Sequence, residues 1–369
     1  DLLYLRTYSG TLNAGAKLQN SRTKETVRAK QILRLYSKNT TAVESVGPGD
    51  IVGIIGPREC GTGDTLCDPR HLVAFEQMAF PEPVISMAVE PQSSREKDRL
   101  GQALHLLCRE DPTLSLAQDE ETGQWLFSGM GELHLEINLK RLKDEFNVGA
   151  RAGEPRVAYR ETFSTEDRVD ATFHKVVGEN ELQAGITLRV APLPRGGDMF
   201  RIKNGLKRKA EVPKAFVQAA ERTLEEGLRT GGNRGYSLIY VDAELLDLDI
   251  HPEKTNESAV VGAVLAAINQ AIRDVGTTVL EPLMHLEIVA PKEVVGDVTS
   301  YLQPRRAVIH KMENVGESKR VSCEVPLAEM FGFGKALPKL TGGRASFSME
   351  PRGYQALPPE IARRQFGYL

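Results

Sequence analysis

Apolar residues in the first 75 positions of the chain occur in short runs that are separated by turn residues. The runs LLYLRTY, AKLQN, AKQILRLY and DIVGIIG alternate with turns such as Ser9-Gly10, Gly47-Pro48-Gly49-Asp50 and Gly61-Thr62-Gly63-Asp64. Many short strands joined by tight turns are typical of an all-β domain, and closing them into a small barrel leaves no edge exposed. We therefore predict a β-barrel over residues 1–76.

The pattern changes after Pro81 and Pro83, which mark a linker. Residues 77–155 follow the order strand, helix, strand, strand, helix, strand, which predicts a ferredoxin-like split βαβ domain with its helices on one face of the sheet. The same order returns over residues 278–357, so we predict a second ferredoxin-like domain there. In detail, the sequence predicts helices over 95–109, 131–146, 292–303 and 327–333, and strands over 112–118, 280–291, 306–313, 321–326 and 345–350.

Residues 156–277 have a different organisation, with strands predicted over 169–174, 186–191 and 237–246 and helices over 212–229 and 259–272. Two helices on a mixed sheet indicate an α/β or α+β domain. The chain as a whole is therefore predicted to be multidomain α+β. Residues 358–369 form a tail to which we assign no structure.

The most polar interruption of this middle domain is the segment from His251 to Asn256, which contains no aliphatic side chain. Pro252 restricts its own backbone and favours an extended conformation at His251. Asn256 or Ser258 is expected to cap the following helix. The prediction is a stiff polar loop between a strand and a helix, and on local sequence alone an ordinary solvated turn explains it best.

Composition narrows the function classes. The net charge of −3 argues against a protein that coats nucleic acid through general positive charge, so any RNA contact requires a local basic cluster. The densest such cluster near the middle domain comprises Lys203, Lys207, Arg208 and Lys209. The longest apolar runs are far shorter than the ~20 residues of a membrane-spanning helix, so no membrane partner is expected. The four cysteines show no metal-binding spacing, which favours free thiols in a reducing compartment.

The sequence contains no self-contained active site. It has no GxxxxGK[ST] phosphate-binding loop, no GxSxG and no HExxH motif. Glu132, His134 and Glu136 alternate along a predicted helix, and residues two apart on a helix point in different directions. We assign no catalytic, cofactor-binding or metal-binding residue to this chain.

Several long stretches resemble domains of the elongation factor G family of translational GTPases. FSGMGELHLEINLKRL (127–142) resembles the third domain of that family, and VPLAEMFGFGKALPKLTGGRASFSMEPRGY (325–354) resembles the fifth. YSGTLNAG, VGPGDIVGIIG and GTGDTLCDP resemble the second, β-barrel domain. The resemblance implies domains II to V, in the order β-barrel, ferredoxin-like domain, ribosomal-protein-S5-like α/β arm and second ferredoxin-like domain. It also implies that GTP and Mg²⁺ bind in a preceding domain, so that this chain alone is inactive as a GTP hydrolase and is a piece of a longer protein.

In this family the fourth domain is an arm whose tip works on the small-subunit side of the ribosome. The resemblance places the tip at two loops, formed here by His251, Pro252, Glu253, Lys254, Thr255, Asn256 and by Gly178, Glu179, Asn180, Glu181. Translocating members carry a tip loop close to G-G-R-G-Q-Y-G, whereas residues 178–184 read G-E-N-E-L-Q-A. Glycines and cations suit close approach to a phosphate backbone, and carboxylates oppose it. Among these residues Lys254 is the one cation that could meet a phosphate.

The sequences IHP and VGE in these loops, and YQAL after the last predicted strand, resemble the branch that includes the second mitochondrial elongation factor G, the ribosome-releasing factor 2. This resemblance implies that the protein splits terminated mitochondrial ribosomes together with ribosome recycling factor. The alternative is a translocating elongation factor that moves tRNA and mRNA. A third class is a GTPase-related binding module that acts without nucleotide.

The implied partners are ribosomal RNA and proteins, ribosome recycling factor and the protein's own GTPase domain. We expect a monomer in the mitochondrial matrix, although no targeting segment is present in the chain. Arg305 and Arg306, at the start of a predicted strand, are candidate contacts to ribosomal RNA; a solvated strand end explains them equally well.

Overall fold

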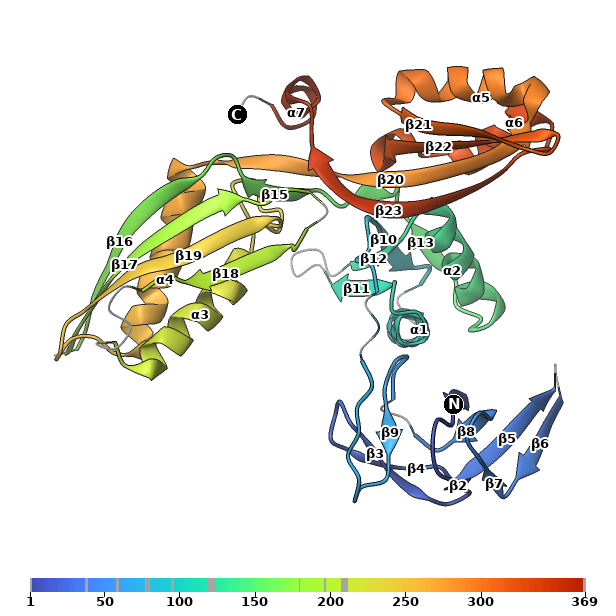
Figure 1. Ribbon diagram of the computed structural model, residues 1–369, viewed down its shortest axis with the longest axis horizontal. Coiled ribbons are helices and arrows are strands. Elements are labelled where there is room, and N and C mark those ends of the chain that lie inside the picture. Colours follow the sequence, from blue (N-terminus) through green and yellow to red (C-terminus); the bar gives the residue numbers. More distant parts are fainter. Residues whose placement is uncertain are drawn as a thin grey trace. The chain divides into compact units, whose positions relative to one another are not determined.

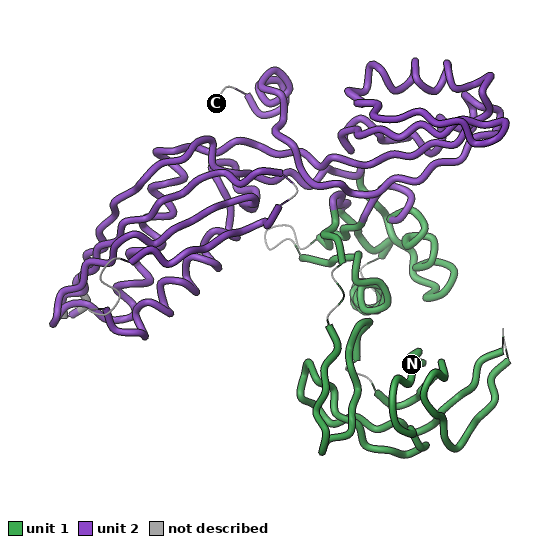
Figure 2. Tube along the Cα trace, viewed as in Figure 1, with its two compact units in different colours: residues 1–83, 88–129, 135–153 green, residues 84–87, 130–134, 154–369 purple. Residues whose placement is uncertain are grey.

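The computed structural model describes residues 2–36, 39–57, 60–76, 78, 80–93, 96–118, 124–178, 180–195, 197–206 and 212–367, and of Val177 and Asn180 the backbone alone. The chain forms two compact units (Figure 2): residues 1–83, 88–129 and 135–153 make up unit 1, and residues 84–87, 130–134 and 154–369 make up unit 2. Within the described residues, no helix is both long and apolar enough to cross a membrane.

The first part of unit 1 is all-β, as its turn-rich pattern predicts. Its strands form a four-stranded sheet in the order β1-β8-β5-β6, a pair β2-β7 and a three-stranded sheet β4-β3-β9. The three sheets share one core, in which Ile32, Val52 and Ile54 are fully buried. The strands are β1 (Leu2–Arg6), β2 (Leu12–Asn13), β3 (Lys17–Asn20), β4 (Thr26–Arg28), β5 (Gln31–Tyr36), β6 (Asn39–Val43), β7 (Ser45–Val46), β8 (Ile51–Ile55) and β9 (Leu66–Cys67).

The next domain has the predicted split βαβ order. Its sheet runs β11-β12-β10-β13, with β14 also paired to β10, and is covered by α1 (Lys97–Glu110) and α2 (Glu132–Asp144). Leucines of both helices, among them Leu104 and Leu135, are fully buried, as is Phe127 of the sheet. The strands are β10 (Ile85–Pro91), β11 (Ser115–Gln118), β12 (Trp125–Gly129), β13 (Ala150–Ala152) and β14 (Arg156–Val157).

The arm in unit 2 is a four-stranded sheet, β16-β17-β19-β18, with α3 and α4 on one face (Figure 1). The long hairpin β16 (Asp167–Val177) and β17 (Asn180–Pro192) is antiparallel, and β17 pairs antiparallel with β19 (Val241–Ile250). The edge strand β18 (Phe200–Asn204) runs parallel to β19. The helices are α3 (Lys214–Leu228) and α4 (Glu257–Asp274).

The strand predicted over 237–246 is displaced in the structure, where β19 begins at Val241 and continues to Ile250. Tyr240 has a positive φ of 55°, which ends the extended run before it. Residues 237–239 instead pair with Glu161 at the base of the arm. Because Leu248 still packs into the core, the strand extends directly to the polar loop.

The last domain is built around β20 (Thr277–Pro291), which pairs with β15 (Arg160–Phe163), β22 (Ser318–Pro326) and β23 (Ser346–Ala356), while β22 pairs with the edge strand β21 (Val308–Val315). The predicted helix over 292–303 is a 3-10 turn followed by α5 (Val295–Leu302). The helix predicted over 327–333 is wrong: a 3-10 turn at Leu327–Glu329 is followed by Gly332 with φ 74°, and the α-helix is α6 (Phe333–Thr341). The tail contains a further helix, α7 (Pro359–Phe366).

Small side chains let α4 lie close to the arm's sheet. Ala259, Ala263, Ala267 and Ala271 are spaced four residues apart and are all fully buried. At Gly262, an added Cβ would lie 2.6 Å from ring carbons of Phe173 in β16. The helix therefore has no room for a larger residue at this position.

Replacing Gly262 by valine should destabilise the arm by about 1–3 kcal/mol, because overpacking a close-packed interface forces shifts of backbone or side chains. Hydrogen–deuterium exchange of α4 amides measures this locally, which suits a chain of several domains. As a contrast, Gly296 in α5 has space around it, since an added Cβ meets no atom within 4 Å. Replacing it by alanine should stabilise its helix by about 0.5–1 kcal/mol. Unchanged exchange in α4 of the valine variant would contradict the close packing.

Candidate functional site

The tip of the arm is formed by the β16–β17 turn and by the loop between β19 and α4, which lie at the same end of the sheet (Figure 1). The hairpin closes with Val177 opposite Asn180, and Gly178 supplies the positive φ of 65° that the turn requires. β19 ends at Ile250, opposite Ala184. The first residues of β17 therefore extend beyond β19, and the following loop occupies the space beside them.

Two hydrogen bonds join the loop between β19 and α4 to Gln183, near the start of β17. Gln183 N donates to the carbonyl of Lys254 at 3.0 Å, and the Thr255 hydroxyl donates to the carbonyl of Gln183 at 2.5 Å. The loop is therefore held against the first residues of β17.

The loop is also closed on itself. The carbonyl of His251 accepts from Thr255 N at 3.0 Å, and His251 N donates to the Thr255 hydroxyl at 2.7 Å. His251 Nδ1 accepts from Glu253 N at 3.2 Å, so the neutral ring carries its proton on Nε2, on an exposed side chain. Asn256 caps α4 by accepting from Ala259 N at 2.9 Å, which confirms one of the two caps predicted.

Three charged or titratable side chains of the tip lie in contact with one another. Lys254 Nζ lies 2.7 Å from Glu181 Oε2, and His174 Nε2 lies 2.7 Å from Glu181 Oε1. The hydrogen bond from Lys254, which has the larger effect, and the one with His174 hold the pKa of the Glu181 carboxyl below its usual range. The sequence predicted Lys254 as a free cation for phosphate, whereas the structure gives it a carboxylate partner.

The His174–Glu181 contact was not predicted from the sequence, although a signal for it exists. His174 in β16 is opposite Gln183 in β17, and Glu181 lies on the same face of β17, two residues closer to the turn. Diagonal neighbours on one face of an antiparallel pair are within reach of long side chains. Recognising the pair required the register, which depends on where the turn falls.

Glu253 and Glu257 add negative charge to the loop and to the first turn of α4, where a carboxylate also suits the helix dipole. Glu179, which the sequence placed in the tip, lies outside the described residues, as does the side chain of Asn180. Among the described side chains of the two loops, the first turn of α4 and His174, there are therefore three carboxylates, the paired Lys254 and two histidines, and the exposed Lys175 lies next to His174 on β16.

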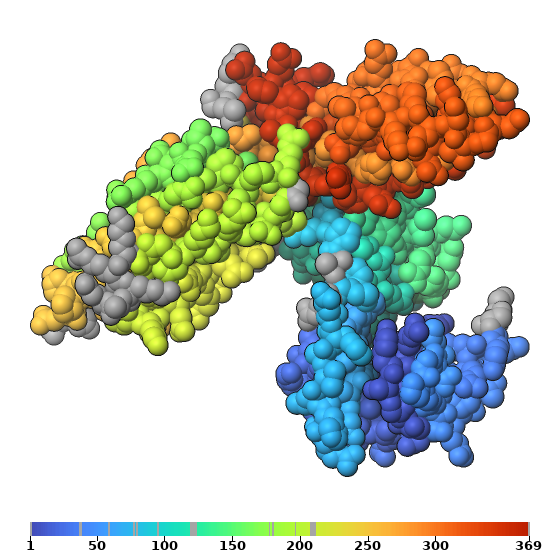
Figure 3. Space-filling view, viewed as in Figure 1, coloured from blue at the N-terminus to red at the C-terminus, as the bar shows by residue number. Residues whose placement is uncertain are grey.

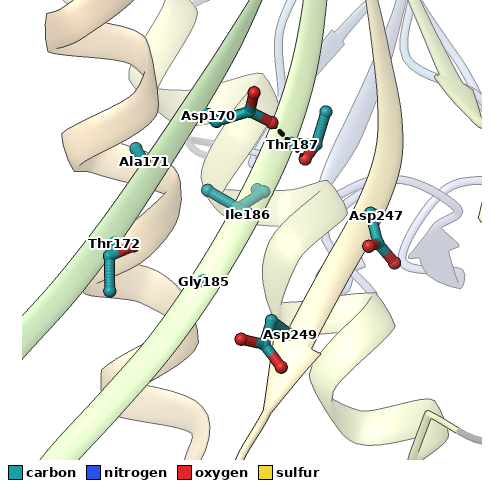
Figure 4. Close-up of a pocket in the computed structure, with 8 residues that line it drawn as sticks. All are labelled: Asp170, Ala171, Thr172, Gly185, Ile186, Thr187, Asp247 and Asp249. Atoms are coloured by element: carbon teal, nitrogen blue, oxygen red, sulfur yellow. Dashed lines mark hydrogen bonds between the residues drawn. The ribbon is translucent and has the colours of Figure 1, made fainter.

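The sheet face opposite the helices is also acidic. An open hollow of about 190 Å³ lies over β16, β17 and β19 (Figure 4), lined by Asp170, Ala171, Thr172, Gly185, Ile186, Thr187, Asp247 and Asp249. Asp170 accepts from the Thr187 hydroxyl at 2.5 Å and from Arg168 at 3.2 Å, and these bonds lower its pKa. In the described part of the chain, no three histidine, cysteine, aspartate or glutamate side chains are grouped so that they could hold a metal ion.

The candidate RNA contacts in the last domain are engaged within the chain. Arg306 donates from Nη1 and Nη2 to the fully buried Glu281, at 2.5 and 2.9 Å, and from Nε to Glu329 at 2.9 Å. Arg305 donates to the carbonyl of Tyr301 at 2.8 Å and lies 3.6 Å from the centre of that ring. An RNA contact by either arginine stays a prediction, and Arg306 has a structural role without one.

The basic cluster near the arm is described in part. Lys203 lies on β18, opposite Glu244 of β19 in the register. Lys207, Arg208 and Lys209 lie outside the described residues. A role of this cluster in facing RNA or in solubility therefore stays a prediction from the sequence.

The Lys254–Glu181 pair can be tested by titration. Because the pKa of Glu181 is lowered in the folded chain, the pair is present above the usual glutamate pKa of about 4.3. It is lost as the pH falls through the lowered value. Replacing Lys254 by methionine should raise the pKa of Glu181 toward its ordinary range, as measured by carbon NMR of the carboxyl group. Replacing Lys175, on the neighbouring strand, by methionine should not, and an equal shift in both variants would show a general field effect instead of a specific pair.

Comparison with known proteins places all four domains. Residues 2–69 match the model of elongation factor G domain 2, residues 80–154 match domain III, residues 155–276 match domain IV, and residues 278–365 match the elongation factor G C-terminus. A crystal structure of a protein from Thermus thermophilus is similar with 31% sequence identity and a TM-score of 0.63, covering 98% of this chain and 54% of that one. This chain thus spans about half the length of that relative. The four family matches leave only residues 1, 70–79, 277 and 366–369 unmatched, and they agree with the multidomain α+β fold: the chain belongs to the elongation factor G family, of which it contains domains II, III and IV and the C-terminal domain.

Proposed function

We propose that this chain is the ribosome-facing part of a GTPase that splits terminated mitochondrial ribosomes together with ribosome recycling factor. The observation that carries the proposal is the Glu181 carboxylate, which lies between Lys254 and His174 and pairs with the one lysine of the two tip loops. A tip built to follow a phosphate backbone would present its cations outward, because phosphate contacts supply most of the affinity for nucleic acid.

The shape of the tip supports the same function. The loop between β19 and α4 is bonded to β17 through Gln183 and closed on itself through Thr255, and these bonds favour a tip that keeps its shape against a partner. Its carboxylates suit a basic protein surface better than RNA. We infer that the tip presses on the recycling factor, a protein, and that the factor in turn separates the subunits.

GTP and Mg²⁺ are proposed to bind in a GTPase domain of the longer protein, since the present sequence contains no phosphate-binding loop. The full-length protein is proposed to act as a monomer in the mitochondrial matrix, with the ribosome and the recycling factor as its partners. A mitochondrial presequence upstream of residue 1 would support this location, and a bacterial or cytosolic full-length sequence would refute it.

The two activities separate in assays on the full-length protein. We expect it to split ribosomes, measured by light scattering, only when recycling factor and GTP are both present. We expect little movement of peptidyl-tRNA, measured by puromycin reactivity, because the acidic tip is poorly suited to the decoding-site RNA. Efficient translocation without splitting would overturn the proposal in favour of the translocating alternative.

The masking of Lys254 predicts a change in salt dependence. In Glu181→Gln, the freed ammonium should strengthen ribosome binding at low salt and steepen the plot of log K against log salt by about 0.7–0.9, the value for one added phosphate contact. Adding Lys254→Gln should cancel this change. Glu253→Gln removes the same charge without touching the pair, so a slope change as large as that of Glu181→Gln would show that net charge alone is responsible.

Residues 1–369 by themselves should not hydrolyse GTP, because phosphoryl transfer requires a phosphate-cradling loop and a bound metal ion that this sequence does not encode. Release of phosphate from labelled GTP measures this. Turnover that survives repurification and is lost on heat denaturation of the chain would contradict the assignment of GTP binding to another domain.

A further inference from the structure

The joint between the arm and the last domain consists of few strands. The chain enters the arm through β15 and leaves it from α4 into β20, and β15 pairs with β20 from Arg160↔Leu280 to Phe163↔Thr277. A third segment, residues 237–239, is hydrogen-bonded along Glu161. The connection between the arm and the last domain therefore depends on a small number of paired segments.

A buried carboxylate organises the joint. Glu161 is fully buried, and its Oε1 accepts from the backbone N–H groups of Arg234 and Tyr236 at 3.0 and 3.1 Å. Its Oε2 accepts from the hydroxyl of Thr277 at the start of β20. The loop over residues 230–236 passes so close that a Cβ on Gly232 would lie 2.4 Å from Oε2. Burial of a carboxylate is costly unless its oxygens are fully hydrogen-bonded, so this loop must stay in place.

The C-terminal segment covers that loop from outside. After β23 ends, Leu357 N donates to the carbonyl of Val279 at 2.9 Å, and α7 then lies at the surface of unit 2 (Figure 3). The ring of Phe366 lies 5.3 Å from Tyr159 and 6.0 Å from Tyr236, both edge-to-face. Tyr159 precedes β15, and Tyr236 belongs to the loop around Glu161. The Phe366 ring therefore contacts both the segment that leads into β15 and the loop around Glu161.

Arg234 fastens the same segment a second time. Its Nη1 donates to the carbonyl of Phe366 at 3.0 Å, and its guanidinium lies 5.3 Å from the centre of the Phe366 ring. The backbone N–H of the same residue is bonded to Glu161. Gln365 adds a hydrogen bond with the Tyr159 hydroxyl at 2.8 Å. The last turn of α7 is thus linked through Arg234 to the buried carboxylate.

We propose that residues 357–367 form a clasp that stiffens the joint at the base of the arm, with Phe366 as its anchor and Arg234 as its link to Glu161. The inference does not depend on the proposed function: it concerns how firmly the arm is held, whichever partner the tip meets. Release of the clasp exposes the loop over 230–236 and lets the β15–β20 ribbon bend.

The test is Phe366→Ala in the full chain. Backbone amides of residues 232–236 should exchange with deuterium about tenfold faster or more, while amides in the middle of α4 stay unchanged. The distribution of distances between spin labels at Glu226 in α3 and Glu317 in the last domain, attached through azide-bearing residues, should broaden. The control Arg363→Ala changes an exposed residue of α7 and should alter neither measurement.

A milder variant guards against general unfolding. Phe366→Leu keeps much of the volume and loses the ring contacts, so it should give an intermediate rate of exchange and an intermediate width. If α7 itself exchanges faster in Phe366→Ala while residues 232–236 and the label distances remain as in the parent chain, the segment is only packed on the surface and the clasp is refuted.

Discussion

The close approach of α4 to the sheet of the arm is the constraint on which the tip depends. Alanines along one face of α4 and Gly262 against Phe173 leave the helix a single depth at which it can pack. The helix α4 begins at Glu257, immediately after the loop. The distance between α4 and the sheet therefore also determines where His251 and Lys254 lie relative to the start of β17. The hydrogen bonds to Gln183 then need little further ordering of the chain.

The chemistry of the tip follows from this placement. Once the loop lies beside the extended end of β17, Lys254 and Glu181 come within contact distance, and an exposed pair of this kind is weak. The pair matters more for the choice of partner than for the stability of the fold. A phosphate can contact Lys254 only by displacing the Glu181 carboxylate. The acidic hollow over β17 and β19 extends the same sign of charge along the arm, so a cationic partner is favoured along this face as well as at the tip.

Much of the architecture could be predicted from the sequence, because long elements carry strong periodic patterns. The helix α4 and the Asn256 cap lie close to their predicted positions. The hairpin strands were predicted over 169–174 and 186–191 but extend further toward the turn, to Val177 and from Asn180. Errors occurred where backbone conformation or tertiary contacts overrode the pattern. Tyr240 and Gly332 adopt positive φ and so move the start of β19 and of α6. The helix α7 is only eight residues long, too short for its pattern to predict it, and Ala362 and Phe366 pack against residues such as Tyr159, more than a hundred positions away.

The site was predictable as a location but not as an arrangement of charges. Pairings such as Glu181 with Lys254 and Arg306 with Glu281 join residues from different elements, and no local pattern encodes them. The second pairing shows why the difference matters. An arginine at a strand end resembles an RNA contact in the sequence, yet Glu281 is fully buried, and withdrawing Arg306 to meet a phosphate would leave that carboxylate without its cation. Arg305, which ends the 3-10 turn Gln303–Arg305 and is stacked on Tyr301 of α5, could approach RNA without that penalty. Any nucleic-acid contact at this end of the last domain should therefore be sought first at Arg305.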